Sequence, residues 1–440
     1  MGIRVAKFGG SSLANGQQFK KVTAIIRANE DRRYVVPSAP GKAPGLEEKV
    51  TDMLYGCQAA FAEGDREKAE NLFAQMGARY TAIVEELGSG YALQPHLDRV
   101  WQCLADGADS DYAASRGEYL NGLILADYLG YAFVDPAEGI RFDENGEFDP
   151  RATQALLGAL LQKTERAVVP GFYGAYADGR IKTFSRGGSD ITGAIVAWVV
   201  QADVYENWTD VPGFLIADPR IVPEAKTIAH ITYQELRELS YMGASVLHED
   251  SIFPVSQCGI PVQVRNTNDP GHPGTLIKAQ TPEESDCLIT GIAGHKGFTV
   301  FHIEKDQMNK LLGFGRRVLA IFERHGVPFE HLPTGIDTMS VVVQDAMLQG
   351  RAHDILRDIQ DELQPDVLDV HGNLALIATV GHSMISRVGI SARLFTALGD
   401  AGVNVRMIDQ GSSELNIIVG VDSGDFEVAV KAVYAAFVGA

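Results

Sequence analysis

The stretch Ile3-Arg4-Val5-Ala6-Lys7-Phe8-Gly9-Gly10-Ser11-Ser12 decides the fold predicted for this chain. It reads as a short buried strand that runs into two glycines and two hydroxyl side chains. Adjacent glycines carry no Cβ, so backbone N–H groups can approach phosphate oxygens, and Lys7 adds a positive charge. The alternative is a solvated lysine before an ordinary tight turn. The sequence contains no Gly-x-x-x-x-Gly-Lys-Ser/Thr and no complete Gly-x-Gly-x-x-Gly motif, which disfavours the usual nucleotide-binding folds.

Composition limits the possible functions. A chain of 440 residues that is 45% hydrophobic can bury large cores, and its length suggests about three domains. The net charge of −19 argues against nucleic-acid and anionic membrane partners. The four cysteines form no Cys-x-x-Cys pair, so neither a zinc site nor a disulfide framework is expected. Without a membrane-length apolar run or a secretory leader, the chain is predicted to be cytoplasmic.

The first half of the chain alternates strands and helices. Apolar residues from Phe19 to Ile26 recur at helical spacing, and Tyr34-Val35-Val36 predicts a second strand that ends near Ser38 and Ala39. Residues 47 to 106 are charged and helical in pattern, which predicts a helical cover or lid. After the strand at 167–169, a hairpin is predicted to turn at Asp178-Gly179.

Glu118 follows Gly117 in a further predicted helix, and we place it near the start of that helix. One interpretation is a carboxylate that interacts favourably with the helix dipole. The other is a ligand for a substrate ammonium group. Position alone leaves both open.

The stretch Ser185-Arg186-Gly187-Gly188-Ser189-Asp190 precedes an apolar helix predicted over 191–200. Unpaired N–H groups and the helix dipole meet at such a turn, so it is a natural anion site. A purely structural role for Asp190 in the first helical turn is the alternative. Because other strands also end in polar loops, including 204–213, an open α/β sheet would gather these loops in one crevice.

Taken together, these motifs resemble those of the aspartate kinases (aspartokinases), specifically monofunctional ones with tandem C-terminal ACT domains. The resemblance covers the whole chain and includes Trp208-Thr209-Asp210 and Asp218-Pro219-Arg220. It implies an α/β amino-acid kinase fold, an open and mainly parallel sheet flanked by helices, followed by two ferredoxin-like α+β ACT domains. The implied boundaries are 1–285 for the catalytic domain, 286–372 for the first ACT region and 373–440 for the second.

The resemblance also implies the reaction and the residues that perform it. ATP with Mg²⁺ would phosphorylate the side-chain carboxylate of aspartate to 4-phospho-L-aspartate, the first step towards lysine, threonine and methionine. Lys7 and Asp190 would be catalytic, and no metal ligands are assigned. The expected aspartate-binding residues are Ser38, Ala39, Glu118, Phe172, Arg186 and Ser189. The expected ATP-binding residues are Lys7, Gly9, Gly10, Ser11, Thr209, Asp210, Asp218 and Arg220.

The chain departs from the family pattern at several positions. Ser11 stands where relatives commonly have threonine, Leu215 where some have tyrosine, and Ser245 where some have a lysine that reaches ATP. The loop after Pro40 also differs, so the family's substrate-binding threonine has no assigned position. Nucleotide contacts beyond Thr209 and Asp210 therefore stay open.

An internal repeat occupies the C-terminal third, where residues 313–343 align without a gap with 389–419. Each copy predicts an amphipathic helix, a Gly-Val pair and two strands, which resembles paired ACT domains. The resemblance implies assembly into a homodimer or homotetramer through these domains and a feedback inhibitor, for which we expect lysine rather than threonine. Gly313, Phe314 and Glu330 would contact it; a solvated Glu330 is the alternative.

Two other functions are compatible with parts of the sequence. A kinase for another acidic amino acid could share the Lys-Gly-Gly loop and the fold, but it would not explain the paired repeat together with the Arg186 motif. The other is a catalytically dead amino-acid sensor, which the retention of four residues argues against: Lys7, Glu118, Arg186 and Asp190. A homoserine dehydrogenase extension is not expected.

Overall fold

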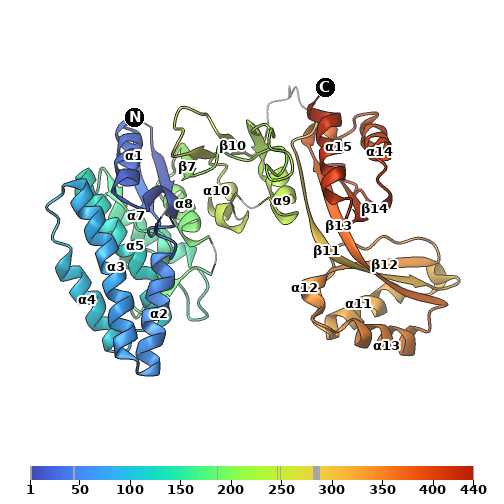
Figure 1. The fold of residues 1–440 in the computed structure, drawn as a ribbon, viewed down its shortest axis with the longest axis horizontal. Helices are drawn as coiled ribbons and strands as arrows, with labels where there is room; N and C mark the ends of the chain where they lie inside the picture. Colours follow the sequence, from blue (N-terminus) through green and yellow to red (C-terminus); the bar gives the residue numbers. More distant parts are fainter. Residues whose placement is uncertain are drawn as a thin grey trace. The chain divides into compact units, whose positions relative to one another are not determined.

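The computed structural model describes residues 2–42, 45–185, 187–244, 246–247, 249–280 and 288–439. The chain forms two compact units, each with its own sheet (Figure 1). The first unit comprises Met1–Phe214, Thr227–Tyr233 and Ser245–Thr281. The second comprises Leu215–Lys226, Gln234–Ala244 and Pro282–Ala440.

The first unit is built on an eight-stranded sheet, whose neighbouring strands are parallel except for the antiparallel pair β10 and β9. The predicted open, mainly parallel α/β sheet is thus confirmed. In spatial order its strands are β3 (Ala132–Phe133), β4 (Ala167–Val168), β2 (Arg32–Pro37), β1 (Arg4–Phe8), β7 (Val204–Thr209), β9 (Val262–Asn266), β10 (Thr275–Lys278) and β8 (His230–Thr232).

Strand β1 lies between β2 and β7, and its side chains alternate between the two faces of the sheet. Ala6 and Phe8 join an apolar core that also contains Phe19 and Trp208. Val5 and Lys7 therefore point to the opposite face. The buried strand predicted from the sequence is confirmed, and the side chain of Lys7 points away from the apolar core.

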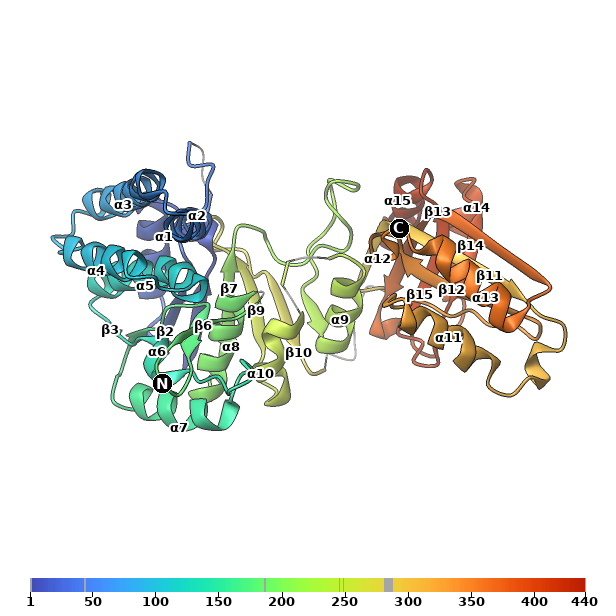
Figure 2. The ribbon, with the colours of Figure 1, turned by 90° about the horizontal axis from the view of Figure 1, so that it is seen from below.

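Helices cover both faces of this sheet (Figure 2). The core of the first face is formed with α1 (Gly16–Arg27), α2 (Val50–Glu63), α3 (Arg66–Leu87), α4 (Gln94–Ala105) and α5 (Ser110–Leu129). The other face carries α7 (Pro150–Leu161), α8 (Gly188–Val199) and α10 (Phe253–Gln257). The helical pattern predicted over 47–106 thus corresponds to three helices.

Short elements complete the first unit. The hairpin predicted at Asp178-Gly179 is present as β5 (Tyr173–Ala175) and β6 (Ile181–Thr183). The remaining short helices are η1 (Gly10–Leu13), α6 (Pro136–Gly139) and η2 (Glu249–Ile252), and α9 (Tyr233–Tyr241) begins at the boundary between the units.

The second unit contains one antiparallel sheet of five strands, in the order β12-β11-β13-β15-β14. Its strands are β11 (Gly291–Glu304), β12 (Thr338–Gln344), β13 (Val367–Val380), β14 (Val405–Asp409) and β15 (Asn416–Asp422). The helices are η3 (Met308–Lys310), α11 (Phe314–Arg324), α12 (Asp345–Leu348), α13 (Ala352–Leu363), η4 (His382–Met384), α14 (Ile390–Asp400) and α15 (Phe426–Val438).

The two long strands β11 and β13 pair along almost their whole length and serve both halves of this sheet. The second half of β11 also pairs with β12, whereas the second half of β13 pairs with β15. Strand β12, which lies between β11 and β13 in the chain, therefore belongs to one half of the sheet. Strands β14 and β15, which follow β13, belong to the other half.

The internal repeat is visible in the structure. Helices α11 and α14 begin and end at equivalent positions of the two copies, and each follows a glycine with positive φ, Gly313 at 75° and Gly389 at 94°. The predicted strand after each Gly-Val pair differs between the copies. It is β14 in the second copy, but in the first it is reduced to isolated bridges, at His331 with Val342 and Thr334 with Met339. Within the described residues, no helix is long and apolar enough to cross a membrane.

Candidate active site

Lys7 and Asp190 meet at the face of the sheet that α8 covers. The Lys7 ammonium lies 2.6 Å from Oδ1 of Asp190, and only 7% of Lys7 is exposed. Strand β1 directs Lys7 to this face, and the first turn of α8 supplies Asp190. Two catalytic residues predicted from stretches more than 180 residues apart are therefore in direct contact.

Asn207, which the sequence did not single out, completes this cluster. It lies opposite Lys7 in the register of β1 and β7. Its amide nitrogen donates a hydrogen bond of 2.8 Å to Oδ1 of Asp190, and its amide oxygen accepts one of 3.4 Å from Lys7. An asparagine within a strand gives no signal by itself, because only the pairing of β1 with β7 places it beside Lys7.

The glycine turn after β1 contacts the backbone of the loop that follows β2. Gly9 donates a backbone hydrogen bond of 3.0 Å to the carbonyl of Trp208, and Gly41 donates one of 2.8 Å to Gly10. A Cβ on Gly10 would lie 2.8 Å from the carbonyl oxygen of Ala39, which is too close for any side chain. Ser11 follows in η1. The glycine at position 10 thus allows the two loops to touch.

Glu118 lies on α5 and contacts the same loop after β2, at Ala39. Its side chain accepts a hydrogen bond from the backbone N–H of Ala39, and its buried Oε2 has no partner in the part of the chain that the structure describes. Burial raises the pKa of Glu118 to about 8, against its ordinary value of 4.5. A buried carboxylate with an unused oxygen is suited to receive a cationic group, such as a substrate ammonium.

The predicted position of Glu118 near a helix start is wrong. Helix α5 begins at Ser110, eight residues earlier, and Glu118 lies well inside it. The helix-dipole interpretation is thereby removed, because the dipole acts within the first turn. The neighbouring Gly117 has a packing reason, since a Cβ there would lie 2.9 Å from the Cβ of Ala39.

Ser38 and Ala39 are held between these elements. The Ser38 N–H donates to the carbonyl of Phe8 at 3.0 Å, and the Ser38 carbonyl accepts a hydrogen bond of 2.6 Å from the side chain of Asn121. Asn121 was not predicted from the sequence. It extends the contact between α5 and the end of β2.

Phe172 and Ser189 lie where the strand end after Pro170 meets α8. Phe172 has a positive φ of 82°, unusual for a residue with a side chain, and its N–H donates to the Thr192 hydroxyl at 3.0 Å. A Cβ on Gly171 would lie 2.6 Å from the Cβ of Ser189. Strained backbone of this kind is characteristic of functional sites. Helix α8 begins at Gly188, earlier than predicted, so Ser189 and Asp190 form its first turn.

Comparison with known proteins identifies the family. The model of the amino acid kinase family matches residues 2–266, and an ACT domain model matches residues 377–437. Aspartokinase 3 of Bacillus subtilis (strain 168) is 38% identical over 454 residues, which cover 99% of this chain and 98% of that protein.

The chain belongs to the aspartokinases.

Solved structures agree with this family assignment. The crystal structure of Clostridium acetobutylicum aspartate kinase has a TM-score of 0.91 and 51% identity, over 99% of this chain and 100% of that one. Escherichia coli aspartokinase III with aspartate and ADP has a TM-score of 0.75 and 26% identity, and its complex with lysine and aspartate has 0.74 and 26%; each covers 99% of both chains. The resemblance, enzyme class and fold predicted from the sequence are confirmed.

The predicted ATP-binding residues of this aspartokinase divide between the two units. Thr209 and Asp210 end β7 in the first unit, where the Thr209 hydroxyl donates to Asp210 at 3.2 Å. Asp218 and Arg220 belong to the second unit and form an ion pair of 2.6 Å with each other. The structure therefore groups Thr209 and Asp210 with Lys7 in one unit and leaves Asp218 and Arg220 in the other.

Of three further positions that the sequence singled out, only Leu215 lies within the described residues. Arg186, the predicted ligand of the aspartate α-carboxylate, and Ser245 lie outside the described residues. Leu215 is the first residue of the second unit.

The predicted effector residues all lie in the second unit. Gly313 precedes α11, and Phe314 is 3% exposed, so it belongs to the core of this half of the sheet. Glu330 donates its backbone N–H to Val342 at 2.7 Å, and its Oε2 accepts a hydrogen bond from the Tyr241 hydroxyl. Glu330 is thus engaged by a tyrosine of α9 rather than being a fully solvated side chain.

The carboxylates of the first unit show whether the candidate site fits a magnesium ion. Among the described residues, no group of three or more His, Cys, Asp or Glu side chains could hold a metal ion. Mg²⁺ needs no such group when phosphate oxygens supply most of its ligands with one or two carboxylates. Oδ1 of Asp190 is engaged by Lys7 and Asn207, whereas its Oδ2 has no partner in the described part of the chain. The site therefore fits a magnesium ion that accompanies a nucleotide.

Proposed function

We propose that the chain transfers the γ-phosphoryl group of ATP to the side-chain carboxylate of L-aspartate. A carboxylate oxygen of aspartate forms the new bond to phosphorus, the bond to the β–γ bridging oxygen breaks, and ADP leaves with that electron pair. The observation that carries the proposal is the buried contact between Lys7 and Asp190 at 2.6 Å, beside the glycine turn. Related E. coli aspartokinase III binds aspartate and ADP in its crystal structure, which supports the same substrates here.

Lys7 supplies positive charge where negative charge spreads over the transferred phosphoryl group. Asp190 and Asn207 fix its ammonium group, so little reorganisation is needed when the reaction begins. The aspartate side chain has an ordinary pKa of about 3.9 and is already ionised at neutral pH. The reaction therefore needs alignment and charge neutralisation rather than a general base.

Glu118 receives the ammonium group of aspartate in this proposal. Its unpartnered Oε2 is the acceptor, and Ala39 holds the other part of the carboxylate. Arg186 would bind the α-carboxylate, as the family resemblance implies, and Ser38, Phe172 and Ser189 would border the same pocket. Gly10 and Glu118 both approach Ala39, which supports neighbouring phosphate and amino-acid sites in this proposal.

ATP is proposed to contact Lys7, Gly9, Gly10, Ser11, Thr209, Asp210, Asp218 and Arg220. Asp190 and Asp210 are the carboxylates that would help hold Mg²⁺, whose charge would offset that of the phosphates. For Asp218 and Arg220 the proposal rests on the resemblance alone.

We further propose that lysine inhibits the enzyme through the second unit, at Gly313, Phe314 and Glu330. The complex of E. coli aspartokinase III with lysine and aspartate supports lysine over threonine. Residues 286–372 and 373–440 would be the two ACT regulatory regions, and residues 1–285 the catalytic domain. Assembly into a homodimer or homotetramer through the ACT regions, cytoplasmic location and a role in lysine, threonine and methionine synthesis belong to the same proposal.

A coupled assay of ADP release tests the function. We expect turnover with aspartate and much less with glutamate or N-acetylglutamate. Preference for either of these compounds would make the chain a kinase of another acidic amino acid. Absence of turnover with all three, combined with lysine binding, would favour the amino-acid sensor.

A further inference from the structure

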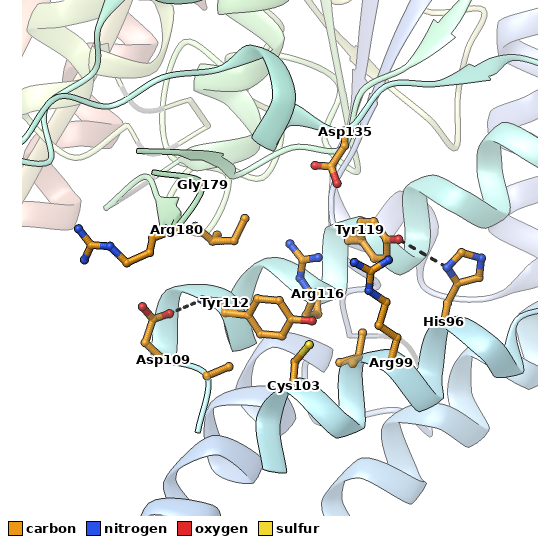
Figure 3. A pocket seen from close by; sticks show the side chains of 13 residues that line it. His96, Arg99, Cys103, Asp109, Tyr112, Arg116, Tyr119, Asp135, Gly179 and Arg180 are labelled. Atoms are coloured by element: carbon orange, nitrogen blue, oxygen red, sulfur yellow. Dashed lines mark hydrogen bonds between the residues drawn. The ribbon is translucent and has the colours of Figure 1, made fainter. Parts of the chain in front are cut away.

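A cavity of about 380 Å³ lies in the first unit between α4, α5 and the β5–β6 hairpin (Figure 3). It is not the candidate active site. Arg116 lines it from α5, whereas Glu118, two positions later on the same helix, contacts Ala39. Two positions along a helix correspond to about 200° around its axis, so the two side chains leave α5 on different sides.

Arg116 is a buried cation that has no carboxylate partner among the described residues. It is 6% exposed, and its guanidinium carbon lies 4.6 Å from the ring centroids of both Tyr112 and Tyr119 and 5.1 Å from that of Tyr173. Its Nε and Nη2 both donate to the Ser115 hydroxyl, at 3.0 and 2.9 Å. Among the described residues, its Nη1 has no hydrogen-bond partner. A buried charge is costly unless it is paired, so an anion would offset an existing penalty.

Arg99 adds a second positive charge at the rim. Its side chain extends from α4 towards Tyr119 (Figure 3), over whose ring the Arg116 guanidinium also lies. Arg99 is exposed and forms no ion pair within the described part of the chain. His96 adds no charge near neutral pH, because burial and then Arg99 lower its pKa below 6.5.

The other charged residues at the cavity each have at least one partner. Arg180 pairs with Asp178 at 2.8 Å. Asp109 caps α5 by accepting from the Tyr112 N–H at 2.8 Å. Asp135 accepts from the Tyr173 hydroxyl at 2.9 Å and from the Ala137 N–H at 3.0 Å. These bonds use only Oδ1 of Asp109 and of Asp135, so both carboxylates keep their negative charge at the cavity. An anion would therefore bind at the guanidinium groups of Arg99 and Arg116, which carry only donors.

We propose that this cavity binds a small organic anion through a carboxylate or phosphate group held by Arg116 and Arg99. Guanidinium groups match both kinds of oxyanion with paired N–H donors. The rings of Tyr112 and Tyr119 and the apolar side chains of Val100 and Ile181 would contact the body of the ligand. The volume suits a molecule of metabolite size.

The test is isothermal titration calorimetry on the full chain, with inorganic phosphate and succinate as separate probes. Saturating aspartate and ADP are present, so that a probe cannot be counted at the candidate active site. Arg99→Ala removes the accessible cation without disturbing the core. Arg180→Ala is the matched control, since it removes an equal charge at the same rim from a residue already paired with Asp178.

We expect at least one probe to bind, and Arg99→Ala to weaken it by about 10-fold or more, the scale of a lost hydrogen bond between charged groups. Arg180→Ala should change binding less than about 2-fold. Preference for phosphate or succinate identifies the anionic group. Arg116→Lys should also weaken binding, with circular dichroism to verify folding.

Two results would overturn the proposal: no binding of either probe to the unmodified chain, or the same affinity in Arg99→Ala. Equal losses in Arg99→Ala and Arg180→Ala would show general charge attraction and also overturn it. If aspartate and ADP themselves fail to bind, the proposed kinase function fails, yet the Arg99 and Arg180 comparison still decides the cavity.

Discussion

Asn207 and Lys7 lie opposite each other on β7 and β1, and both contact the same oxygen of Asp190. The amide of Asn207 thus orients a carboxylate and an ammonium group at once. Because Asp190 comes from a helix and the other two from strands, the cluster fixes α8 against the centre of the sheet.

Asn207→Ala should lower turnover by about 10- to 100-fold, the effect of losing a hydrogen bond to a charged group in a preorganised site. The KM for aspartate should change less, since Asn207 contacts Lys7 and Asp190 rather than Glu118. Steady-state kinetics measure both. Gln263→Ala in β9 is the control, and an equal loss in that variant would mean that Asn207 has only a structural role.

Lys7→Met and Asp190→Ala should each lower turnover by at least about 10²-fold, as expected when one electrostatic stabiliser is removed. The double variant should be little worse than either single variant, because the two side chains act as a pair. ADP-release assays on variants with unchanged circular dichroism test this. Near-normal turnover in either would exclude the proposed site.

Glu118 should make aspartate binding pH-dependent. Its pKa of about 8 in the free enzyme lies above the ordinary 4.5, and binding of an ammonium group requires the ionised form. Aspartate affinity should therefore fall as pH decreases below 8, by up to about 10-fold per pH unit. Calorimetry from pH 6 to 9 measures it. The isosteric Glu118→Gln should bind weakly with little pH dependence; a slope equal to that of the unmodified chain would contradict the assignment.

The same pKa shift should also affect stability. The folded state holds the Glu118 proton more tightly than the unfolded state, so this group contributes stability that declines as pH rises between 4.5 and about 8. The decline should approach about 1.4 kcal/mol per pH unit in mid-window, and it should be absent in Glu118→Gln. Urea unfolding of the ligand-free chain at several pH values compares the two slopes.

Arg79 should be essential for the loop that touches the glycine turn. This buried side chain donates to the carbonyls of Gly41, of Glu48 at 2.8 Å and of Ala14 at 3.4 Å. Arg79→Met should lower the free energy of unfolding by about 1 to 3 kcal/mol, the cost of unpaired buried polar groups, and should reduce kcat/KM. Arg66→Met, on the exposed side of α3, serves as the control and should change neither.

Glu330→Ala should raise the lysine concentration needed for inhibition while uninhibited turnover stays near normal. In the free enzyme Glu330 accepts a hydrogen bond from Tyr241, so lysine would compete for an engaged carboxylate. Tyr241→Phe should accordingly lower the inhibitory concentration. Glu323→Ala, an exposed position on α11, is the control. Unchanged inhibition in Glu330→Ala would reject the effector role.

The sequence predicted the parts of the site that depend on local chemistry. The strand before Gly9 and Gly10, the turn before Asp190 and the repeat in the second unit all have signals within a few residues. Asn207, Asn121 and Arg79 have none, because their partners are backbone or side-chain groups of distant segments. The start of α5 was missed because its first turns are polar and only its later part is strongly apolar.

Strands β11 and β13 extend through both halves of the five-stranded sheet, so the two halves share these strands. A chain cut at residue 372 would lose the edge that closes one half and would leave β11 unpaired over its first residues. We therefore expect the two halves of this sheet to unfold in one cooperative transition. Because β11 and β13 belong to both halves, a rotation of one half would also turn the other.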